Sequence, residues 1–270
     1  MRILTAIKQV PETSNVTMDA ETGTMQRSGL EAIINPLDLY AIETALRMKE
    51  ICGGSVTVIT MGPPKADQAL REAVAMGCDD GVLLSDRRFG GADTWATAYT
   101  LAQAVRALGG FDLIVCGERA TDGDTGQVGP SLAALLDINL ATYVSHVQSM
   151  QDGRLRVERL TEEGRQVLAL SMPALLTVIK EIASPRLPTL DGMKRARRMQ
   201  IPVWKPEDIH ADPAKIGLHG SPTRVVKIAS PKVTRQSERI DAATAEDIDR
   251  AAARFWQYLQ EHDLTGGSHD

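Results

Sequence analysis

The feature that most constrains the fold is an alternation of short apolar runs with helical patterns over the first half of the chain. The two kinds of segment follow one another at 3–7, 35–50, 55–60, 64–77, 81–85, 93–108, 111–117 and 126–136. Continuous apolar strands separated by helices are typical of a parallel sheet buried on both faces. With right-handed crossovers, the pattern predicts a doubly wound α/β fold whose sheet is mostly parallel and Rossmann-like.

The first helix carries a clear start signal. Asn35 is placed as N-cap, Pro36 stands at the first helical position, and Asp38 lies in the first turn. A helix N-terminus is therefore expected directly after residue 35.

The pattern changes at about residue 140. Strand signals separated by turns continue to residue 179 and predict an antiparallel extension of the sheet. Residues 184–235 are rich in proline and predict an extended arm, followed by an amphipathic helix at 244–262. We therefore expect an α/β domain at 1–183 and an arm with a C-terminal helix at 184–270, which either embrace a partner subunit or fold back on their own domain.

Composition excludes several classes of protein. Lys and Arg number 30 against 35 Asp and Glu, and aromatic residues make up 4% of the chain, a balance that favours neither a nucleic-acid nor a membrane-surface partner. No apolar stretch is long enough to span a bilayer, and no signal peptide is recognisable, so a cytoplasmic protein is expected. The three cysteines are widely spaced, and no metal site or catalytic set of side chains is expected.

Ligands of doubly wound sheets bind beyond the carboxyl ends of the strands, where the strand order reverses. Three segments are expected to meet there: the end of the first strand with Ala6 and Lys8, the helix start at Asn35–Asp38, and the loop 117–130. The chain has neither a G-x-G-x-x-G fingerprint nor a phosphate-binding lysine loop. The site therefore cannot be assigned from such a motif.

The loop 117–130 is rich in glycine but also carries acidic residues. Its helix N-terminus near Thr125–Val128 offers free N–H groups to a phosphate, and Gly126 and Gly129 permit a close backbone approach. We expect Asp124 to cap the following helix, and Asp122 to bind a ribose or to turn the loop. The alternative is an ordinary capped loop.

A second helix start combines Asp93, Thr94 and Thr97. The two threonines suit a second phosphate, although their spacing alone favours simple capping of the helix.

Several segments, in this order, carry a family resemblance: "KQVPET" (8–13), "NPLDLYAIETAL" (35–46), "ATDGDTGQVGPSLAALL" (120–136), "VERLTEEGRQVLALSMPALLTV" (157–178) and "SPRLPTLDGMKRARRMQI" (184–201). Together they resemble the beta subunit of electron transfer flavoprotein along nearly the whole chain. The resemblance implies a heterodimer with an alpha subunit that carries the redox FAD. It further implies an electron carrier that serves acyl-CoA dehydrogenase-type flavoenzymes.

In the family, the segments that match Ala6, Asn35–Asp38, Met61 and Asp122–Ala133 bind AMP. The cofactor-binding residues expected here are Ala6, Lys8, Asn35, Pro36, Asp38, Met61, Asp93, Thr94, Thr97, Asp122, Asp124, Thr125, Gly126, Gln127, Val128 and Gly129. The family's recognition loop for dehydrogenases maps to 184–198. Leu190 takes the place of its anchoring leucine, and Arg195 and Arg198 stand where relatives have lysines, so these three are expected to bind the partner.

One segment, 85–102, resembles the anaerobic, electron-bifurcating branch of the family. In that branch the beta subunit holds a second FAD in place of AMP, NADH docks near this flavin, and ferredoxin or flavodoxin receives one of the two electrons. Leu160 departs from mitochondrial-type relatives, which have an acid there.

Three hypotheses follow. The chain is an electron-transferring subunit with its own FAD, or a subunit that binds AMP structurally and only supports the alpha-subunit FAD, or a nucleotide-dependent hydrolase of similar topology. The third requires a triphosphate-binding loop, which the sequence lacks.

Overall fold

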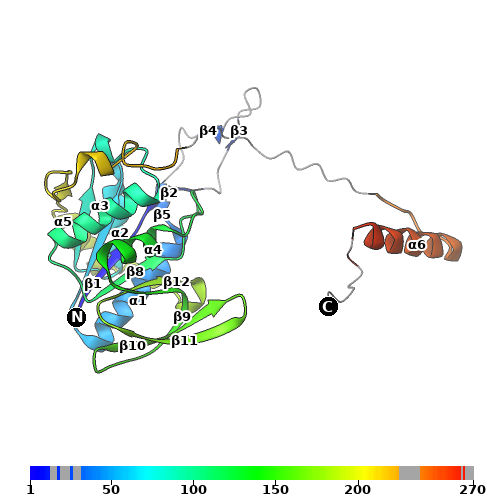
Figure 1. Cartoon of the computed structure of the whole chain (residues 1–270), viewed down its shortest axis with the longest axis horizontal. Coiled ribbons are helices and arrows are strands. Elements are labelled where there is room, and N and C mark those ends of the chain that lie inside the picture. Colours follow the sequence, from blue (N-terminus) through cyan, green and yellow to red (C-terminus); the bar gives the residue numbers. More distant parts are fainter. Residues whose placement is uncertain (13–16, 19–24, 27–31, 225–237, 263, 265–270) are drawn as a thin grey trace. The chain divides into compact units, whose positions relative to one another are not determined.

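The computed structural model describes residues 1–12, 17–18, 25–26, 32–224, 238–262 and 264 (Figure 1). The chain divides into two compact units, Met1–Arg224 and Val225–Asp270.

The first unit contains nearly all of the regular structure. Its strands are β1 (Arg2–Ala6), β2 (Gln9–Pro11), β3 (Thr17–Met18), β4 (Met25–Gln26), β5 (Ala32–Ile34), β6 (Ser55–Met61), β7 (Asp80–Leu84), β8 (Leu113–Gly117), β9 (Asn139–Gln151), β10 (Arg154–Thr161), β11 (Gly164–Ser171), β12 (Ala174–Val178) and β13 (Val203–Trp204). Its α-helices are α1 (Pro36–Cys52), α2 (Asp67–Met76), α3 (Thr94–Ala107), α4 (Val128–Leu136) and α5 (Leu190–Arg198). Short 3-10 helices are η2 (Pro64–Ala66), η3 (Arg87–Phe89), η4 (Lys180–Ile182) and η5 (Pro213–Lys215).

The main sheet has nine strands in the order β11-β10-β9-β12-β8-β1-β6-β7-β13. The pairs from β9 to β13 are parallel, whereas β10 pairs antiparallel with both β9 and β11. The predicted α/β class, the mostly parallel sheet and the antiparallel extension are therefore confirmed. The sequence pattern did not show that β12 returns to the centre of the sheet, between β8 and β9. All five residues of β12 are buried, as expected for a strand covered on both faces.

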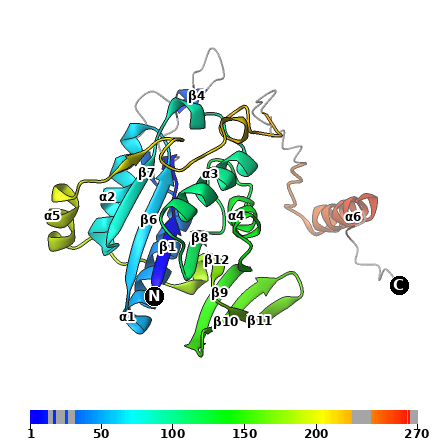
Figure 2. The same cartoon turned by 60° about the vertical axis from the view of Figure 1, so that its left-hand side comes forward.

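Helices cover both faces of the parallel part of the sheet (Figure 2). On one face, α1 and α2 pack on side chains that include Ile3, Val58 and Val115. On the other face, α3 and α4 pack on side chains that include Leu4 and Ile114. Neighbouring residues of one strand thus point into opposite layers, which is the reason for the continuous apolar runs in the sequence.

The strand order fixes where a ligand site can form. From β1 the chain passes through α1 to β6 and through α2 to β7, moving outward on one side of β1. It then passes through α3 to β8, on the other side of β1. The order therefore reverses between β1 and β8, and the crevice of a doubly wound fold lies beyond the carboxyl ends of these two strands.

The described part of the expected arm differs from an extended segment. Residues 190–198 form α5, β13 pairs with β7, and the compact unit extends to Arg224 rather than ending at residue 183. The chain at 217–223 packs near the start of α3, where the N–H of Leu218 donates to the carbonyl of Gly90 at 3.0 Å. This part of the arm follows the alternative reading and packs on its own domain. Residues 225–237 lie outside the described residues.

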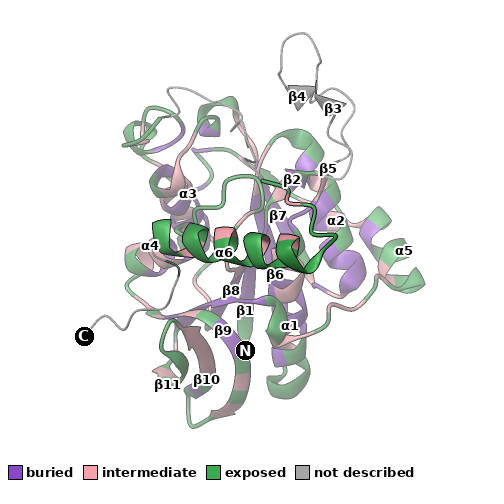
Figure 3. Ribbon diagram, turned by 90° about the vertical axis from the view of Figure 1, so that its right-hand side faces the viewer, coloured by how far each residue is buried: buried purple, intermediate pink, exposed green. Residues whose placement is uncertain are grey.

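The second unit contains α6 (Ala245–Glu261). Thr244 and Asp247 form the capping box that the sequence predicts, with each side chain bonded to the other residue's backbone N–H. None of its residues is buried, and Ile248, Phe255 and Trp256 are all more than half exposed (Figure 3). The amphipathic pattern is present, and no described residue of the second unit itself covers its apolar face.

Candidate functional site

Asn35 connects the start of α1 to the loop after β8. It occupies the N-cap position, as the sequence predicts, but its side chain makes no capping hydrogen bond. Instead its Nδ2 donates to the carbonyl of Arg119 at 2.9 Å, and its Oδ1 accepts from the N–H of Thr121 at 3.1 Å. Asn35 is buried, and both polar atoms of its side-chain amide form hydrogen bonds that hold the loop against the helix.

Asp38 lies beneath the same junction. Its Oδ2 accepts the backbone N–H of Lys8 at 2.7 Å, and the nearby Asn35 side chain and the N–H of Gly117 also favour its charged form. Burial raises the pKa of Asp38 to about 7, although these interactions oppose the change. One buried carboxyl group therefore joins the chain after β1, the start of α1 and the end of β8.

Gly117 makes this junction possible. A Cβ at position 117 would collide with Oδ1 of Asp38 and would lie 2.9 Å from the carbonyl carbon and oxygen of Leu37. Sequence reasoning missed this residue, although a glycine at the end of a buried strand is a signal of close approach.

The acidic residues of the loop are matched by cations of the same site. Lys8 Nζ lies 2.7 Å from Oδ1 of Asp122, and Arg119 Nη1 lies 3.1 Å from Oδ1 of Asp124. The carboxylate of Glu118 lies 3.7 Å from Arg119 Nε. These internal pairs explain how the loop tolerates its acids, and Arg119 is a site residue that the sequence pattern did not single out.

The expected capping role of Asp124 is wrong. Asp124 has a φ of 52° and turns its carboxylate to Arg119, while α4 begins at Val128 with Gln127 at the N-cap position and no side-chain capping bond. Among the described residues, the backbone N–H groups of 125–129 have no hydrogen-bond partner. Uncapped N–H groups and the positive end of the helix dipole together suit an anionic ligand such as a phosphate.

The two glycines of this helix start differ in their roles. Gly126 has a φ of 64°, in the left-handed region that favours glycine, and a Cβ there would lie 3.9 Å from the hydroxyl of Tyr143. A Cβ at Gly129 would lie 2.5 Å from Cγ2 of Thr177 in β12. The small size of Gly129 is therefore required by the packing of α4 on the sheet, and its expected role in ligand approach stays a prediction.

Ala6 and Met61 lie at the same edge of the sheet. Ala6 ends β1 and pairs with Cys116 of β8 on one side and Ile59 of β6 on the other, and Met61 ends β6. The structure thus brings Ala6, Met61 and the loop 117–129 to the carboxyl ends of adjacent strands.

The start of α3 is capped internally. The Asp93 carboxylate accepts the N–H of Ala96 at 3.0 Å, and it also accepts the N–H and the hydroxyl of Thr223, at 3.0 and 2.8 Å. No hydrogen bond or ion pair between described residues joins Asp93, Thr94 or Thr97 to the Asn35–Asp122 junction. Capping by Asp93 is thus observed, and a phosphate contact of Thr94 and Thr97 stays a prediction.

Helix α5, which carries the three expected partner-binding residues, is fixed to α2 by two arginines. Arg71 of α2 donates to the carbonyls of Ala196 and Met199 at the end of α5, the latter at 3.1 Å. Arg195 of α5 donates in return to the carbonyls of Val74, at 3.1 Å, and Cys78. Each arginine thus satisfies carbonyls at the C-terminal end of the other helix.

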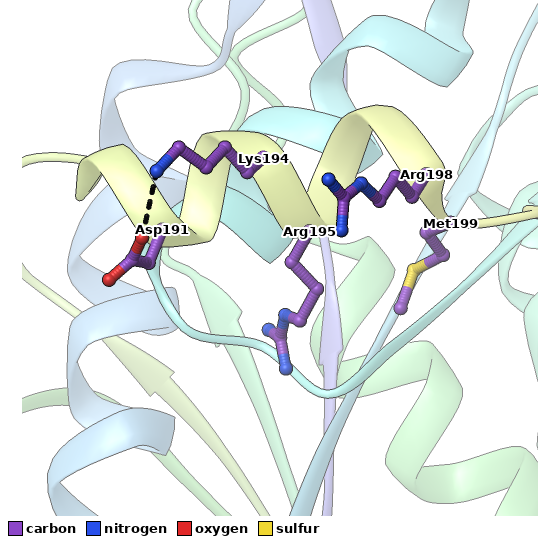
Figure 4. A pocket seen from close by; sticks show the side chains of 5 residues that line it. All are labelled: Asp191, Lys194, Arg195, Arg198 and Met199. Carbon is purple, nitrogen blue, oxygen red and sulfur yellow. Dashed lines mark hydrogen bonds and ion pairs between the residues drawn. The ribbon is translucent and has the colours of Figure 1, made fainter.

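The outer surface of α5 combines apolar and basic side chains. Leu190 is 74% exposed, and Met193 is exposed nearby. A hollow of ≈ 450 Å³ is lined by Asp191, Lys194, Arg195, Arg198 and Met199. Figure 4 shows Lys194 turned toward Asp191, while Arg195 extends away from the helix. Binding of a partner by Leu190, Arg195 and Arg198 stays a prediction, and Arg195 has a structural role as well.

A second hollow of ≈ 910 Å³ lies along the antiparallel extension. It is lined by Thr142, Tyr143, Arg159, Leu160, Thr161, Glu162, Glu163, Gly164, Arg165 and Gln166. Nε of Arg159 is buried without a hydrogen-bond partner among the described residues. The sequence marked residues 157–178 as carrying the family resemblance, but it predicted no binding surface there.

Neither a membrane span nor a metal centre is found among the described residues. None of their helices is long and apolar enough to cross a bilayer. The same part of the chain contains no group of three or more His, Cys, Asp or Glu side chains that could hold a metal ion.

Comparison with known proteins decides the family. The electron transfer flavoprotein domain matches residues 22–209. The electron transfer flavoprotein subunit beta of Thermoanaerobacterium thermosaccharolyticum is 44% identical over 94% of this chain and 98% of its own length. The chain belongs to the electron transfer flavoprotein family, as a relative of its beta subunits. Such beta subunits pair with an alpha subunit.

Two further relatives of this electron transfer flavoprotein chain have more specific names. The caffeyl-CoA reductase–Etf complex subunit CarD of Acetobacterium woodii is 44% identical over 92% of this chain and 95% of its own length. The protein FixA of Azotobacter vinelandii is 40% identical over 97% and 96%, respectively.

Proposed function

We propose that this chain is the beta subunit of a heterodimeric electron transfer flavoprotein, and that it holds an FAD of its own at the carboxyl edge of the sheet. The backbone N–H groups of 125–129, which have no partner among the described residues, carry this proposal, because they offer a pyrophosphate several donors at the positive end of α4. The segment 85–102, which resembles the electron-bifurcating branch of the family, favours the electron-bifurcating type. The alternative is a chain that binds AMP structurally and only supports the alpha-subunit FAD.

The protein supplies position and electrostatics at this site. A bound flavin would supply the hydride and single-electron chemistry. Thr125–Gly129 would hold its phosphates, while Lys8 and Asp122 would stand at the mouth of the crevice. The buried Asp38 would keep the chain after β1 and the end of β8 in register with α1. We propose that NADH donates electrons at this site and that ferredoxin or flavodoxin receives part of them.

The cofactor content of the purified heterodimer tests this proposal. After denaturation, flavin and AMP are quantified per heterodimer. Two flavins and no AMP are expected. One flavin with one AMP would exclude the bifurcating type and establish the alternative.

A pair of loop variants locates the second flavin. Gly126→Val places a branched side chain at a φ of 64° and should remove the flavin of this chain while the alpha-subunit flavin stays bound. Gly123→Ala is the matched control, since a Cβ at Gly123 has no atom within 4 Å. Equal flavin content in both variants would argue against this loop as the binding site.

We further propose that the segment 184–198 docks a dehydrogenase-type flavoenzyme, such as an acyl-CoA dehydrogenase. The exposed Leu190 would fill an apolar pocket of the partner, and the basic side chains beside it would face acidic ones. Leu190→Ala should raise the KM for the dehydrogenase. Leu218→Ala, at another exposed leucine, should leave it unchanged.

We also propose that α6 contributes to binding the alpha subunit, because no described residue of its own unit buries its apolar side chains. Removal of residues 244–270 should weaken assembly of the heterodimer, measured by analytical ultracentrifugation. Unchanged assembly would refute this part of the proposal.

A further inference from the structure

Few backbone hydrogen bonds hold the described chain that leads into α5. Residues 183–189 have no regular structure, and Pro185 and Pro188 have no N–H to donate. Among the described residues 183–188, only Arg186 has its backbone N–H in a hydrogen bond. The acceptor is Oε2 of Glu43, 3.1 Å away on α1.

Glu43, like Asp38, is an acidic residue whose side chain is buried. Only 3% of the residue is exposed. Its carboxylate accepts Arg186 Nε at 2.8 Å, Arg186 Nη2 at 3.2 Å and Arg47 Nε at 2.8 Å. Burial tends to raise the pKa of Glu43, but the hydrogen bonds from Arg186 and Arg47 hold the pKa below its ordinary value. The group is therefore a charged anchor, and its hydrogen-bonding capacity is largely filled.

The anchor is specific for the shape of arginine. The guanidinium group of Arg186 spans Glu43 and Glu50, with Nη1 2.6 Å from Oε1 of Glu50. Because the Glu50 carboxylate is more than half exposed, its ion pair with Arg186 stabilises the fold less than the buried ion pair between Glu43 and Arg186. A planar guanidinium can serve two carboxylates and stay fixed, whereas a lysine provides one point charge.

The contact between Arg186 and Glu43 lies beside the residues proposed to bind the partner. Leu187 follows Arg186 directly and is 83% exposed, and Leu190 begins α5. Downstream, the N–H of Thr189 donates to the carbonyl of Ala75 at 3.2 Å, which ties the start of α5 to α2. The span that carries Leu187 is therefore held by Glu43 on one side and by α2 on the other.

We infer that Glu43 is a positioning residue for docking of the flavoenzyme partner: from inside the domain, its carboxylate fixes Arg186 and so presents Leu187 and Leu190 in one arrangement. This inference rests on the proposed docking role of 184–198. Glu43 itself touches no partner, because its side chain is covered by its own domain. Pre-arranging a docking segment raises affinity because less conformational freedom is lost on binding.

Hydrogen exchange of the intact heterodimer measures the fixation without a partner. Glu43→Gln keeps the size of the side chain but removes its charge. The Arg186 amide is expected to exchange about tenfold faster in this variant, because its charged acceptor is lost. Glu50→Gln is the matched control, on the same helix and with the same arginine, and should change this exchange little. Equal exchange of the Arg186 amide in wild type and Glu43→Gln would overturn the inference.

Kinetics then test the link to docking. The probe is a short-chain acyl-CoA dehydrogenase reduced with butyryl-CoA, and reduction of the heterodimer is followed as a function of heterodimer concentration. Glu43→Gln should raise the KM about tenfold with little change in kcat, since only pre-arrangement is lost. In the double variant with Leu190→Ala, the two effects should not add, because both act through the same contact. Additive effects, or a change in kcat alone, would overturn the inference.

Two further outcomes are distinguishable. If wild type and Leu190→Ala have the same KM, the proposed docking role of 184–198 fails, whatever Glu43 does. If Leu190→Ala raises the KM and Glu43→Gln does not, only the positioning role fails. Should Glu43→Gln not assemble, Arg186→Lys replaces it. This variant keeps a cation beside Glu43 but loses the planar guanidinium group. It should likewise raise the KM with little change in kcat.

Discussion

The buried carboxyl group of Asp38 should make the protein less stable as the pH rises. Its pKa of about 7 in the folded state lies above the ordinary value of 3.8. Between these values the folded protein holds a proton that the unfolded chain releases. The stability from this group is therefore fully present below the ordinary pKa and is lost as the pH rises through about 7.

The magnitude follows from the difference in pKa. The interval of about 3 units corresponds to about 4 kcal/mol over the whole window, at about 1.4 kcal/mol per unit. About 2 kcal/mol of this change falls between about pH 5.5 and about pH 8.

The comparison with Asp38→Asn isolates this group, since an amide does not titrate. Urea unfolding of the heterodimer is measured at both pH values for wild type and variant, in the same cofactor state. The variant should gain about 2 kcal/mol relative to wild type on going to the higher pH. Glu72 and Glu118 also have raised pKa values, but they are present in both proteins and cancel in the difference. A difference between the two proteins that stays constant with pH would refute the reasoning.

Three further substitutions test close contacts of the fold. Gly117→Ala places a methyl group against Asp38 and should cost about 1–3 kcal/mol of unfolding free energy and lower nucleotide content, measured by urea unfolding and by cofactor analysis. Gly192→Ala drives a methyl group into the backbone of Ala75, with 2.9 Å to its carbonyl carbon, and should increase hydrogen exchange in α5 while exchange in α3 stays unchanged. Asp93→Ala removes the cap of α3 and the tie to Thr223, and should cost about 1 kcal/mol and make the chain near residue 223 more sensitive to protease.

Local patterns predicted the parts of the fold that depend on neighbours in sequence. Asn35 and Pro36 mark the start of α1, although Asn35 makes no capping hydrogen bond, and the Thr244–Asp247 pair caps α6. Both signals lie within one turn of a helix. The buried strands were recognisable because both faces of the sheet are covered. The meeting of Lys8, Asn35 and the loop after β8 followed from the topology rule for doubly wound sheets.

The errors concern contacts between residues far apart in sequence. Asp is a residue type that often caps helices, but the left-handed backbone of Asp124 and the nearby Arg119 direct its carboxylate to Arg119 instead of to α4. For Gly129 the sequence suggested only a ligand contact and did not show that Thr177 of β12 requires its small size. The insertion of β12 between β8 and β9, and the packing of 217–223 against the start of α3, depend on tertiary pairing that no local window contains.

Helix α1 is shared by two surfaces. Its first residues lie beneath the proposed nucleotide crevice through Asp38, and Glu43 and Glu50, further along the helix, hold the segment that leads to Leu190 and is proposed to dock the flavoenzyme. A rigid rod of backbone hydrogen bonds thus spans both. Thermodynamic reciprocity then applies: whatever factor an occupied crevice imposes on the affinity for the flavoenzyme, the docked flavoenzyme imposes the same factor on the affinity for the nucleotide.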